Sequence, residues 1–361
     1  MKRRHFEEIA PICPVCAKAN RPESPLRLGT VHQESQGDVL QGSLHCDSYG
    51  CQMEYPIIDG IPYLVPDLRA FMSVSLEHTL MRSDLHDTLE SLLGDCMGPG
   101  TVYDATRQYL SSYGWDHYGE FDPSESDVSA KQSGVVACLN ACWPHMTVGA
   151  GPLVEVGTSV GRVAFELAER SDALVLGVDL NIAMLRVASR VLREGRVRYP
   201  RRRVGVVYDR REFEVSFKAS ERVDFWACDA TVLPLRSASV GAMVGLNVLD
   251  TVVSPLHLLA SADRLVSDGG SLALCSPYDW APTATPFEGW VGGHSQRGPM
   301  RGEVEPLLRS LMTPGAHPQA TQRLCVSYEK PDVPWAVRVH DRSTMHYSSH
   351  LVVAKVNASK R

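Results

Sequence analysis

From Leu153 onward the sequence alternates short apolar runs with amphipathic helical runs, and this alternation is the strongest constraint on the fold. Such a pattern is typical of βαβ units, whose strands lie parallel in one sheet. The expected strands are Leu153 to Val156, Leu174 to Val178, Val223 to Ala227, Val240 to Leu246 and Ser271 to Ser276, with a closing antiparallel pair near Val333 to His340 and His350 to Val356. The expected helices are Val160 to Ser171, Ile182 to Gly195 and Pro255 to Leu265. We therefore predict an α/β fold with a seven-stranded, mostly parallel sheet.

Length and charge exclude several classes of protein. A chain of 361 residues with 44% hydrophobic and 22% charged residues suits a folded protein of two domains, or of one large domain with an appendage. The net charge of −6 disfavours a broad basic surface for nucleic acid. No apolar run approaches the roughly 18 residues of a membrane span, and Glu7 and Glu8 stand where a signal peptide would be apolar. We expect a cytoplasmic protein that does not cross a membrane.

Four of the ten cysteines form two close pairs, Cys13 with Cys16 and Cys46 with Cys51. A Cys-x-x-Cys turn directs two thiolates at one point, and two such turns complete a closed tetrahedral zinc site. Closed zinc sites of this kind are structural. We therefore predict a structural zinc ion bound by these four cysteines.

The second cysteine pair leads into Met53 to Pro66, which is typical of two short strands around an Asp-Gly turn. Residues 1–66 are therefore predicted to form a small zinc-ribbon domain. The run from Tyr55 to Pro62 resembles the zinc-ribbon activator subunit that partners tRNA and protein methyltransferases. That resemblance implies a ribbon that holds the enzyme together, docks a protein partner or touches the substrate.

Residues 67–148 are predicted to be a helical linker or lid region between the ribbon and a main domain at 149–361. Helical periodicity is visible around Leu76 to Leu93 and near Ala130 to Cys142. The segment from Tyr113 to Gly119 is unusually aromatic. It indicates either packing over a flat ligand or an ordinary core contact.

The first strand of the main domain runs into a glycine-containing turn that opens a helix, from Glu155 to Arg162. Small residues there let the backbone approach a ligand, and the helix N-terminus offers free N–H groups. The second strand ends in Asp179, whose carboxylate can accept hydrogen bonds from both hydroxyls of a ribose. These two features alone fit either a dinucleotide enzyme or an S-adenosylmethionine enzyme.

The spacing of the turn favours S-adenosylmethionine. A dinucleotide site uses Gly-x-Gly-x-x-Gly to approach a pyrophosphate, whereas this turn reads Glu-x-Gly-x-x-x-Gly. The Glu155 carboxylate would repel a pyrophosphate but attract a sulfonium and an amino group. Asp229, an expected acceptor for the adenine amino group, and Asn247 follow later strands, so polar residues collect at the carboxyl ends. The predicted cofactor residues are Glu155, Gly157, Ser159, Gly161, Arg162, Asp179, Leu180, Asp229, Ala230 and Asn247.

The segment from about 150 to 356 resembles class I S-adenosylmethionine-dependent methyltransferases, which implies a Rossmann-like fold. Several stretches within it look like the mercaptohistidine N-methyltransferase domain of ovothiol biosynthesis: Ser159 to Ala168, Glu194 to Tyr199, Asn247 to Asp250, Ser276 to Trp280, Thr285 with Pro286, and Trp290 to Gly293. Two features depart from that pattern. Ser159 replaces the usual middle glycine, and the iron-dependent sulfoxide-synthase part often fused to that domain is missing.

Methyl transfer to nitrogen needs a group that orients the acceptor or removes its proton. Asp250, Tyr278 and Asp279 are the predicted catalytic residues because both of their segments follow strand ends beside the cofactor; turn capping is the alternative. Trp280 and Trp290, together with Tyr278, would wall an aromatic or cationic substrate by stacking and cation–π contacts. Core packing would explain the same residues.

One insertion is densely positive, with arginines at positions 196, 198, 201, 202, 203, 210 and 211. Blocks of like charge usually lie in water, so we expect a solvated surface loop. The alternative is a site for phosphate or an anionic substrate.

Together these features predict a methyltransferase acting on a small, nitrogenous metabolite with an imidazole or amine group. One alternative is an RNA methyltransferase of the guanine type, because a zinc ribbon ahead of this fold also resembles a bacterial ribosomal-RNA guanine methyltransferase. In that case the ribbon would recognise the substrate. The other is a non-catalytic scaffold whose ribbon docks a partner, an alternative supported by Ser159.

Overall fold

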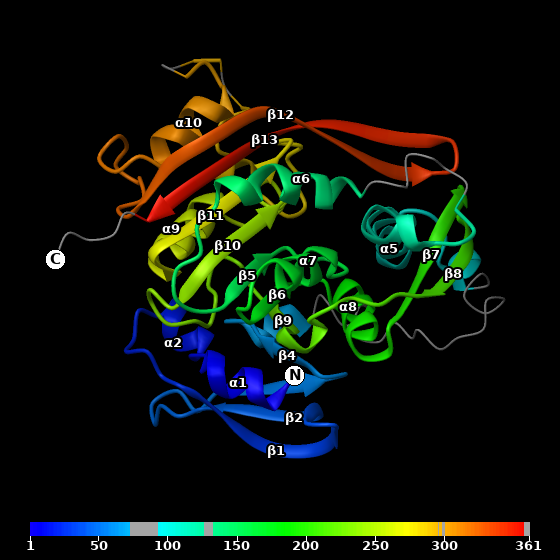
Figure 1. Ribbon diagram of the computed structural model, residues 1–361, viewed down its shortest axis with the longest axis horizontal. Helices are drawn as coiled ribbons and strands as arrows, with labels where there is room; N and C mark the ends of the chain where they lie inside the picture. Colours follow the sequence, from blue (N-terminus) through cyan, green and yellow to red (C-terminus); the bar gives the residue numbers. More distant parts are fainter. Residues whose placement is uncertain (73–92, 126–132, 295, 298–299, 357–361) are drawn as a thin grey trace.

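A sheet of 11 strands runs through the centre of the molecule (Figure 1). The structure, a computed structural model, describes residues 1–72, 93–125, 133–294, 296–297 and 300–356. The strand order is β1-β2-β3-β4-β9-β6-β5-β10-β11-β13-β12. The bounds of these strands are β1 Leu26–Ser35, β2 Asp38–Cys46, β3 Glu54–Ile58, β4 Ile61–Leu64, β5 Leu153–Val156, β6 Val175–Asp179, β9 Val223–Cys228, β10 Val240–Leu246, β11 Val266–Ser276, β12 Leu324–His340 and β13 Ser343–Val356.

The seven strands expected from the sequence lie side by side in this sheet. β9, β6, β5, β10 and β11 are parallel, and β13 and β12 follow as antiparallel strands. The prediction of an α/β fold with a parallel centre is therefore confirmed. The predicted number of strands was too low, because the N-terminal strands continue the same sheet: Tyr63 and Leu64 of β4 pair with β9.

Side chains alternate between the two faces of the strands and so build two separate cores. In β5, Val154 and Val156 belong to one core and Leu153 belongs to the other. Helices α9 and α10 cover the first face, and α6, α7 and α8 cover the second. The helices described over their full length are α1 Arg3–Ile9, α2 Pro14–Lys18, α5 Val102–Tyr118, α6 Gly134–Cys142, α7 Arg162–Arg170, α8 Ile182–Glu194, α9 Pro255–Leu265 and α10 Val304–Leu311.

Short polar residues fix where several helices begin. The Asn181 side chain accepts hydrogen bonds from the first turn of α8, and Ser254 does the same for α9, which starts with Pro255. Thr101 and Ser133 cap α5 and α6. Such caps satisfy backbone N–H groups that have no partner within the helix. The helix expected near Ala130 to Cys142 is therefore present as α6, whereas the one expected around Leu76 to Leu93 lies almost entirely outside the described residues.

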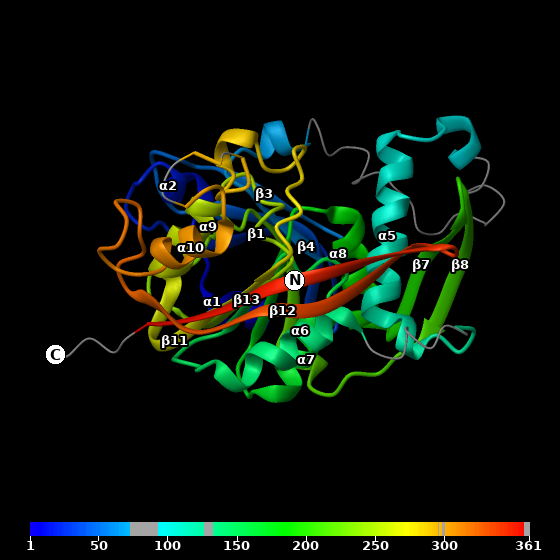
Figure 2. The ribbon, with the colours of Figure 1, turned by 90° about the horizontal axis from the view of Figure 1, so that it is seen from above.

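The arginine-rich insertion is a β-hairpin, β7 Arg196–Val204 with β8 Val207–Glu214, and the expectation of a surface loop was wrong. Val197 and Tyr199 alternate with the arginines and are buried. This two-residue period is a strand signal that the density of charge concealed. The hairpin lies beside α5 and the far end of the long β12–β13 pair (Figures 1 and 2).

Within the described residues, no helix combines the length and the apolar character that crossing a membrane would require.

Candidate functional site

Three residues with unusual backbone conformations mark the carboxyl edge of the parallel strands. Ser159, Asn247 and Tyr278 follow β5, β10 and β11 and have φ angles of 53°, 59° and 58°. A side chain other than glycine rarely adopts this left-handed region, and such strain collects at functional sites. The strands that carry these residues are neighbours in the sheet. The sequence-predicted edge is therefore a strained, polar surface of the fold.

Asp179 holds the turn after β5 in place. One carboxylate oxygen accepts a hydrogen bond from the Ser159 N–H at 2.8 Å, and the other accepts from the Asn181 N–H at 2.8 Å. A carboxylate has about four lone-pair positions, so each oxygen can accept one further hydrogen bond. Burial raises the pKa of Asp179, whereas the two backbone hydrogen bonds lower it and offset part of the rise. The carboxylate thus has the capacity needed for two ribose hydroxyls.

Glu155 is buried at the start of the same turn. It accepts a hydrogen bond of 2.6 Å from the Thr158 hydroxyl. Burial raises the pKa of Glu155 to about 8, and the nearby Asp179 carboxylate adds to the rise. Gly157 and Gly161 flank this turn with φ angles of 71° and 92°.

The remaining predicted cofactor residues take different positions. Asp229 accepts two hydrogen bonds from Thr231, both at Oδ1, while Ala230 is buried and Leu180 is exposed. Asn247 is tied to β11 by its backbone N–H, which donates to the Cys275 carbonyl at 2.6 Å. That these residues bind the cofactor is a prediction from the sequence, which binding experiments can test.

The Arg162 side chain is occupied by protein groups. Its guanidinium pairs with Glu120 at 2.7 Å and with Glu166 at 2.8 Å. It also lies over the rings of Phe121 and Phe217. Both carboxylates contact Nη2, while Nε and Nη1 are buried without a hydrogen-bond partner.

Asp250 lies in the loop after β10 and is 1% exposed. Neither of its carboxylate oxygens has a hydrogen-bond partner of normal geometry. Burial raises the pKa of Asp250, although the Ser276 hydroxyl and the Asp279 backbone offset part of the rise. A buried carboxylate without a full set of partners is costly to keep.

The segment after β11 connects to β13. The hydroxyl of Tyr278 lies 2.6 Å from Nδ1 of His350, and the Tyr347 hydroxyl donates to Asp279 at 3.2 Å. Burial lowers the pKa of His350 and raises that of Tyr278. Sequence reasoning missed Tyr347 and His350, because no local motif distinguishes two polar residues within a long strand.

Two tryptophans stack beside Tyr278. The Trp280 and Trp290 rings are 5.6 Å apart and nearly parallel, and the Tyr278 ring lies 6.5 Å from Trp280. The Trp280 Nε1 is buried without a hydrogen-bond partner, while Trp290 donates to the Thr285 carbonyl. The aromatic set expected from the sequence is therefore assembled in one place.

Helix α5 carries aromatic residues to the same edge. The backbone N–H of Arg162, at the start of α7, donates to Nδ1 of His117, and the Tyr118 hydroxyl donates to the Val160 carbonyl. Burial lowers the pKa of His117 to about 3, so this ring is neutral. Burial raises the pKa of Tyr113, and the nearby Tyr347 and Asp250 raise it further. The aromatic segment of α5 thus packs against the predicted cofactor turn.

The four N-terminal cysteines converge as predicted. The Sγ atoms of Cys13, Cys16, Cys46 and Cys51 all lie within 4.8 Å of one another. Cys13 to Cys51 is 3.8 Å and Cys16 to Cys46 is 3.9 Å. Zinc–sulfur bonds of about 2.3 Å in a tetrahedron place sulfur atoms roughly 3.8 Å apart. The four thiols therefore fit a tetrahedral zinc ion.

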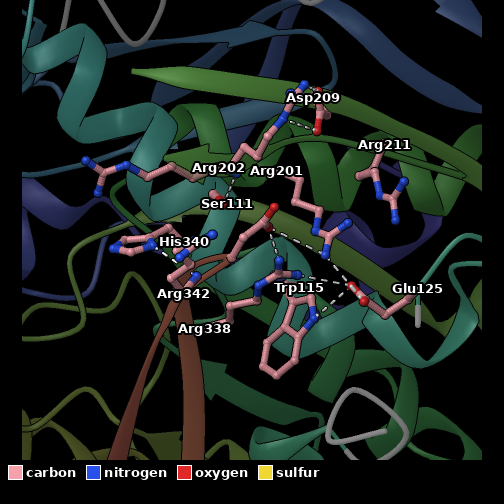
Figure 3. A network of polar contacts seen from close by, with 12 residues as sticks. Ser111, Trp115, Glu125, Arg201, Arg202, Asp209, Arg211, Arg338, His340 and Arg342 are labelled. Carbon is pink, nitrogen blue, oxygen red and sulfur yellow. Dashed lines mark hydrogen bonds and ion pairs between the residues drawn. The ribbon is translucent and has the colours of Figure 1, made fainter. Parts of the chain in front are cut away.

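A buried charge network joins the hairpin to α5 and β12 (Figure 3). The Glu125 side chain, 3% exposed, pairs with Arg201 at 3.4 Å and Arg338 at 3.2 Å, and accepts from Trp115 Nε1. Asp341 also contacts both arginines. Arg196, Arg201, Arg203 and Arg211 of the hairpin pair with carboxylates, and Arg202 donates to the Gln108 side chain.

Comparison with known proteins identifies the centre of the chain. Residues 154–274 match the model of a family described as a methyltransferase domain. This match covers β5 through most of β11, the strands whose carboxyl ends carry the predicted cofactor residues. Residues 154–274 are therefore similar to a methyltransferase domain. No curated protein sequence matches the chain.

Solved structures of other methyltransferases are similar to parts of the chain. Two are Haemonchus contortus phosphoethanolamine N-methyltransferase 2, at 21% and 18% identity, TM-scores of 0.29 and 0.33, and 39% and 60% of this chain covered. The chain spans only 27% and 37% of the length of those two chains. A third is Streptomyces coelicolor geranyl diphosphate C-methyltransferase, at 15% identity and a TM-score of 0.43, covering 71% of this chain and 98% of that one.

Proposed function

We propose that this protein transfers a methyl group from S-adenosylmethionine to a nitrogen of a small metabolite. The observation that carries the proposal is the carboxyl edge of the sheet. There the Asp179–Ser159 turn lies beside a second group of polar and aromatic residues around Asp250 and Tyr278. A cofactor site and an acceptor site on neighbouring strands are what a two-substrate transfer requires.

The chain's own residues have distinct roles in this proposal. Asp179 binds the ribose hydroxyls through its free lone pairs, and Asp229 accepts from the adenine amino group at Oδ2, since its two bonds to Thr231 both end on Oδ1. Glu155 lies at the head of the turn and faces the positive end of the cofactor. S-adenosylmethionine, when bound, supplies a methyl group on a positively charged sulfur, and its transfer to nitrogen releases one proton.

Asp250 is the proposed group that receives this proton. Burial raises its pKa, which moves a carboxylate toward the range in which it is an effective base near neutral pH. Tyr278 and Asp279 orient the acceptor, Tyr278 through its contact with His350 and Asp279 through its hydrogen bond with Tyr347.

The four clustered cysteines would bind a structural zinc ion, since their spacing fits a tetrahedral site and all four positions are thiols. An RNA acceptor remains the less favoured alternative. Four of the seven arginines of the hairpin pair with carboxylates, which reduces the positive charge left for phosphates.

The test is calorimetric titration of the purified protein with S-adenosylmethionine and with its demethylated product. We expect micromolar binding of both. Asp179→Ala should weaken binding by about 1–3 kcal/mol, because a charge-assisted hydrogen bond is lost. Asp209→Ala, which removes only an exposed partner of Arg203, is the matched control and should bind normally. Failure of the folded wild-type protein to bind either compound would leave the scaffold alternative.

A further inference from the structure

We propose that the methyl acceptor is bound as an organic cation, with Asp250 as its counter-charge and with Tyr113 and Tyr347 completing its binding site. This inference rests on the proposed function, because it concerns the acceptor side of the same carboxyl edge. It specifies the class of acceptor as one that carries an ammonium or imidazolium group.

The first argument is the missing partner of Asp250. Its side chain is almost fully buried, and both oxygens lack a hydrogen-bond partner of normal geometry. Burial of this group is costly, and only the weaker contacts with the Ser276 hydroxyl and the Asp279 backbone offset part of the cost. A cation bound against the carboxylate would offset the remaining cost, so the residue is better explained by a ligand than by the fold.

The second argument is the sign of the charge around the site. The charged group that raises the pKa of Asp250 is another acid, Asp279. The charged groups that raise the pKa of Tyr347 are Asp279 and Asp250. Arg162 and Arg338, on neighbouring elements, are each paired with two carboxylates: Arg162 with Glu120 and Glu166, and Arg338 with Glu125 and Asp341. A phosphate or diphosphate at Asp250 would therefore meet two carboxylates.

The third argument is the aromatic lining. Trp280 stacks between Trp290 and Tyr278, and its Nε1 is a second buried polar atom without a partner. The faces of such rings attract cations, most strongly when water is excluded. Tyr347 is held by its hydrogen bond to Asp279, and Tyr113 approaches from α5. Aromatic faces and carboxylates together favour a cationic ligand over a neutral or anionic one.

The experiment uses the full chain saturated with S-adenosylhomocysteine and titrated calorimetrically. The cationic probes are histamine, histidine, ethanolamine and putrescine; the anionic probes are inorganic phosphate and inorganic diphosphate. We expect at least one cationic probe to bind and neither anionic probe to do so. Binding of an anionic probe at the expense of the cations, or no binding of any cation, would overturn the inference.

Variants locate the site. Asp250→Asn should weaken binding of the cationic probe at least tenfold while leaving the affinity for S-adenosylhomocysteine within twofold. Tyr113→Leu should weaken it several-fold, whereas Tyr113→Phe, which retains the aromatic face, should bind nearly normally. Asp209→Asn is the control, because it removes an acid from the distant end of the hairpin. Equal binding by the wild type and Asp250→Asn would overturn the assignment.

Stability separates a binding role from a structural one. Without ligand, Asp250→Asn should melt at the same temperature as the wild type or higher, because it removes a buried charge that lacks a partner. A clearly lower melting temperature would mean that the carboxylate supports the fold, and would overturn the inference. If the wild type fails to bind S-adenosylhomocysteine, the proposed function fails; if it binds without preferring cations, only this inference fails.

Discussion

Glu155 is a buried acid whose protonation is coupled to folding. Burial raises its pKa to about 8 in the folded protein, against an ordinary value of 4.5. Between these values the folded state holds a proton that the unfolded state has lost. Stability therefore falls as the pH rises through this window, because the folded state binds more protons.

Glu155→Gln removes this titration and tests it. As the pH rises from about 5 to 8, we expect the free energy of unfolding of the variant to increase relative to that of the wild type. The difference should grow by at most about 1.4 kcal/mol per pH unit. Urea denaturation at four pH values, without cofactor, measures the difference. Parallel stability curves for the two proteins would show that Glu155 is already ionised when folded.

Ser159 shows how a residue can depart from a family pattern and still keep its geometry. The resemblance to methyltransferases predicts glycine here, and the serine nevertheless adopts a φ of 53°. Its N–H donates to Asp179, and its hydroxyl lies 3.1 Å from the Met184 sulfur. The local bonds hold the left-handed conformation, so the serine by itself is weak support for a scaffold.

At the scale of elements, the β7–β8 hairpin, α5 and β12 form one unit around Glu125. This side chain is buried between Arg201 and Arg338. Breaking a buried ion pair typically costs about 3–5 kcal/mol, whereas an exposed pair contributes about 0–1 kcal/mol. Without the Glu125 charge, the two arginines would keep only the more exposed Asp341 as an acidic partner.

Glu125→Gln should therefore lower the free energy of unfolding by several kcal/mol. Glu212→Gln, which breaks the exposed pair with Arg196 on the same hairpin, is the matched control and should change it by less than about 1 kcal/mol. Urea denaturation compares the two variants. Similar effects in both would mean that the buried network contributes no more than the surface pair.

At the scale of the whole molecule, the cysteine cluster and the methyltransferase domain are parts of one sheet. β4 pairs with β9, and the backbone of Ile12 in the ribbon donates to the Pro234 carbonyl. Cys13 and Cys16 are buried in the same core as Val154 and Leu176. Removing a zinc ion bound by the four cysteines should therefore destabilise the whole sheet and not only the N-terminal segment.

We expect about one zinc ion per chain by elemental analysis, and a lower melting temperature of the whole protein after chelation or in Cys46→Ser. The expected loss is several kcal/mol, since structural zinc contributes directly to folding. Cys96→Ser, at an exposed cysteine outside the cluster, is the control. An unchanged melting temperature in metal-free protein would exclude a structural role for zinc.

Sequence alone determined the strand-end order of Asp179, Asp229 and Asn247 and the clustering of the four cysteines. Both follow from short-range rules. Parallel strands joined by helices bring their carboxyl ends to one edge, and a Cys-x-x-Cys turn brings two thiols together within a few residues. These rules depend on local periodicity and spacing, which a single sequence contains.

Only the tertiary structure decided how the ribbon and the hairpin attach. The β4–β9 pairing is made by backbone groups, which carry no side-chain signal. Glu125 meets Arg201 and Arg338 across 76 and 213 residues of sequence, and these contacts form only once α5, β7 and β12 are packed. The charge of the hairpin was visible in the sequence, but its pairing with Asp122, Glu125 and Asp341 was not, because these acids lie on other segments. Desolvation of Asp250 is likewise a consequence of packing, since burial depends on every segment that covers the residue.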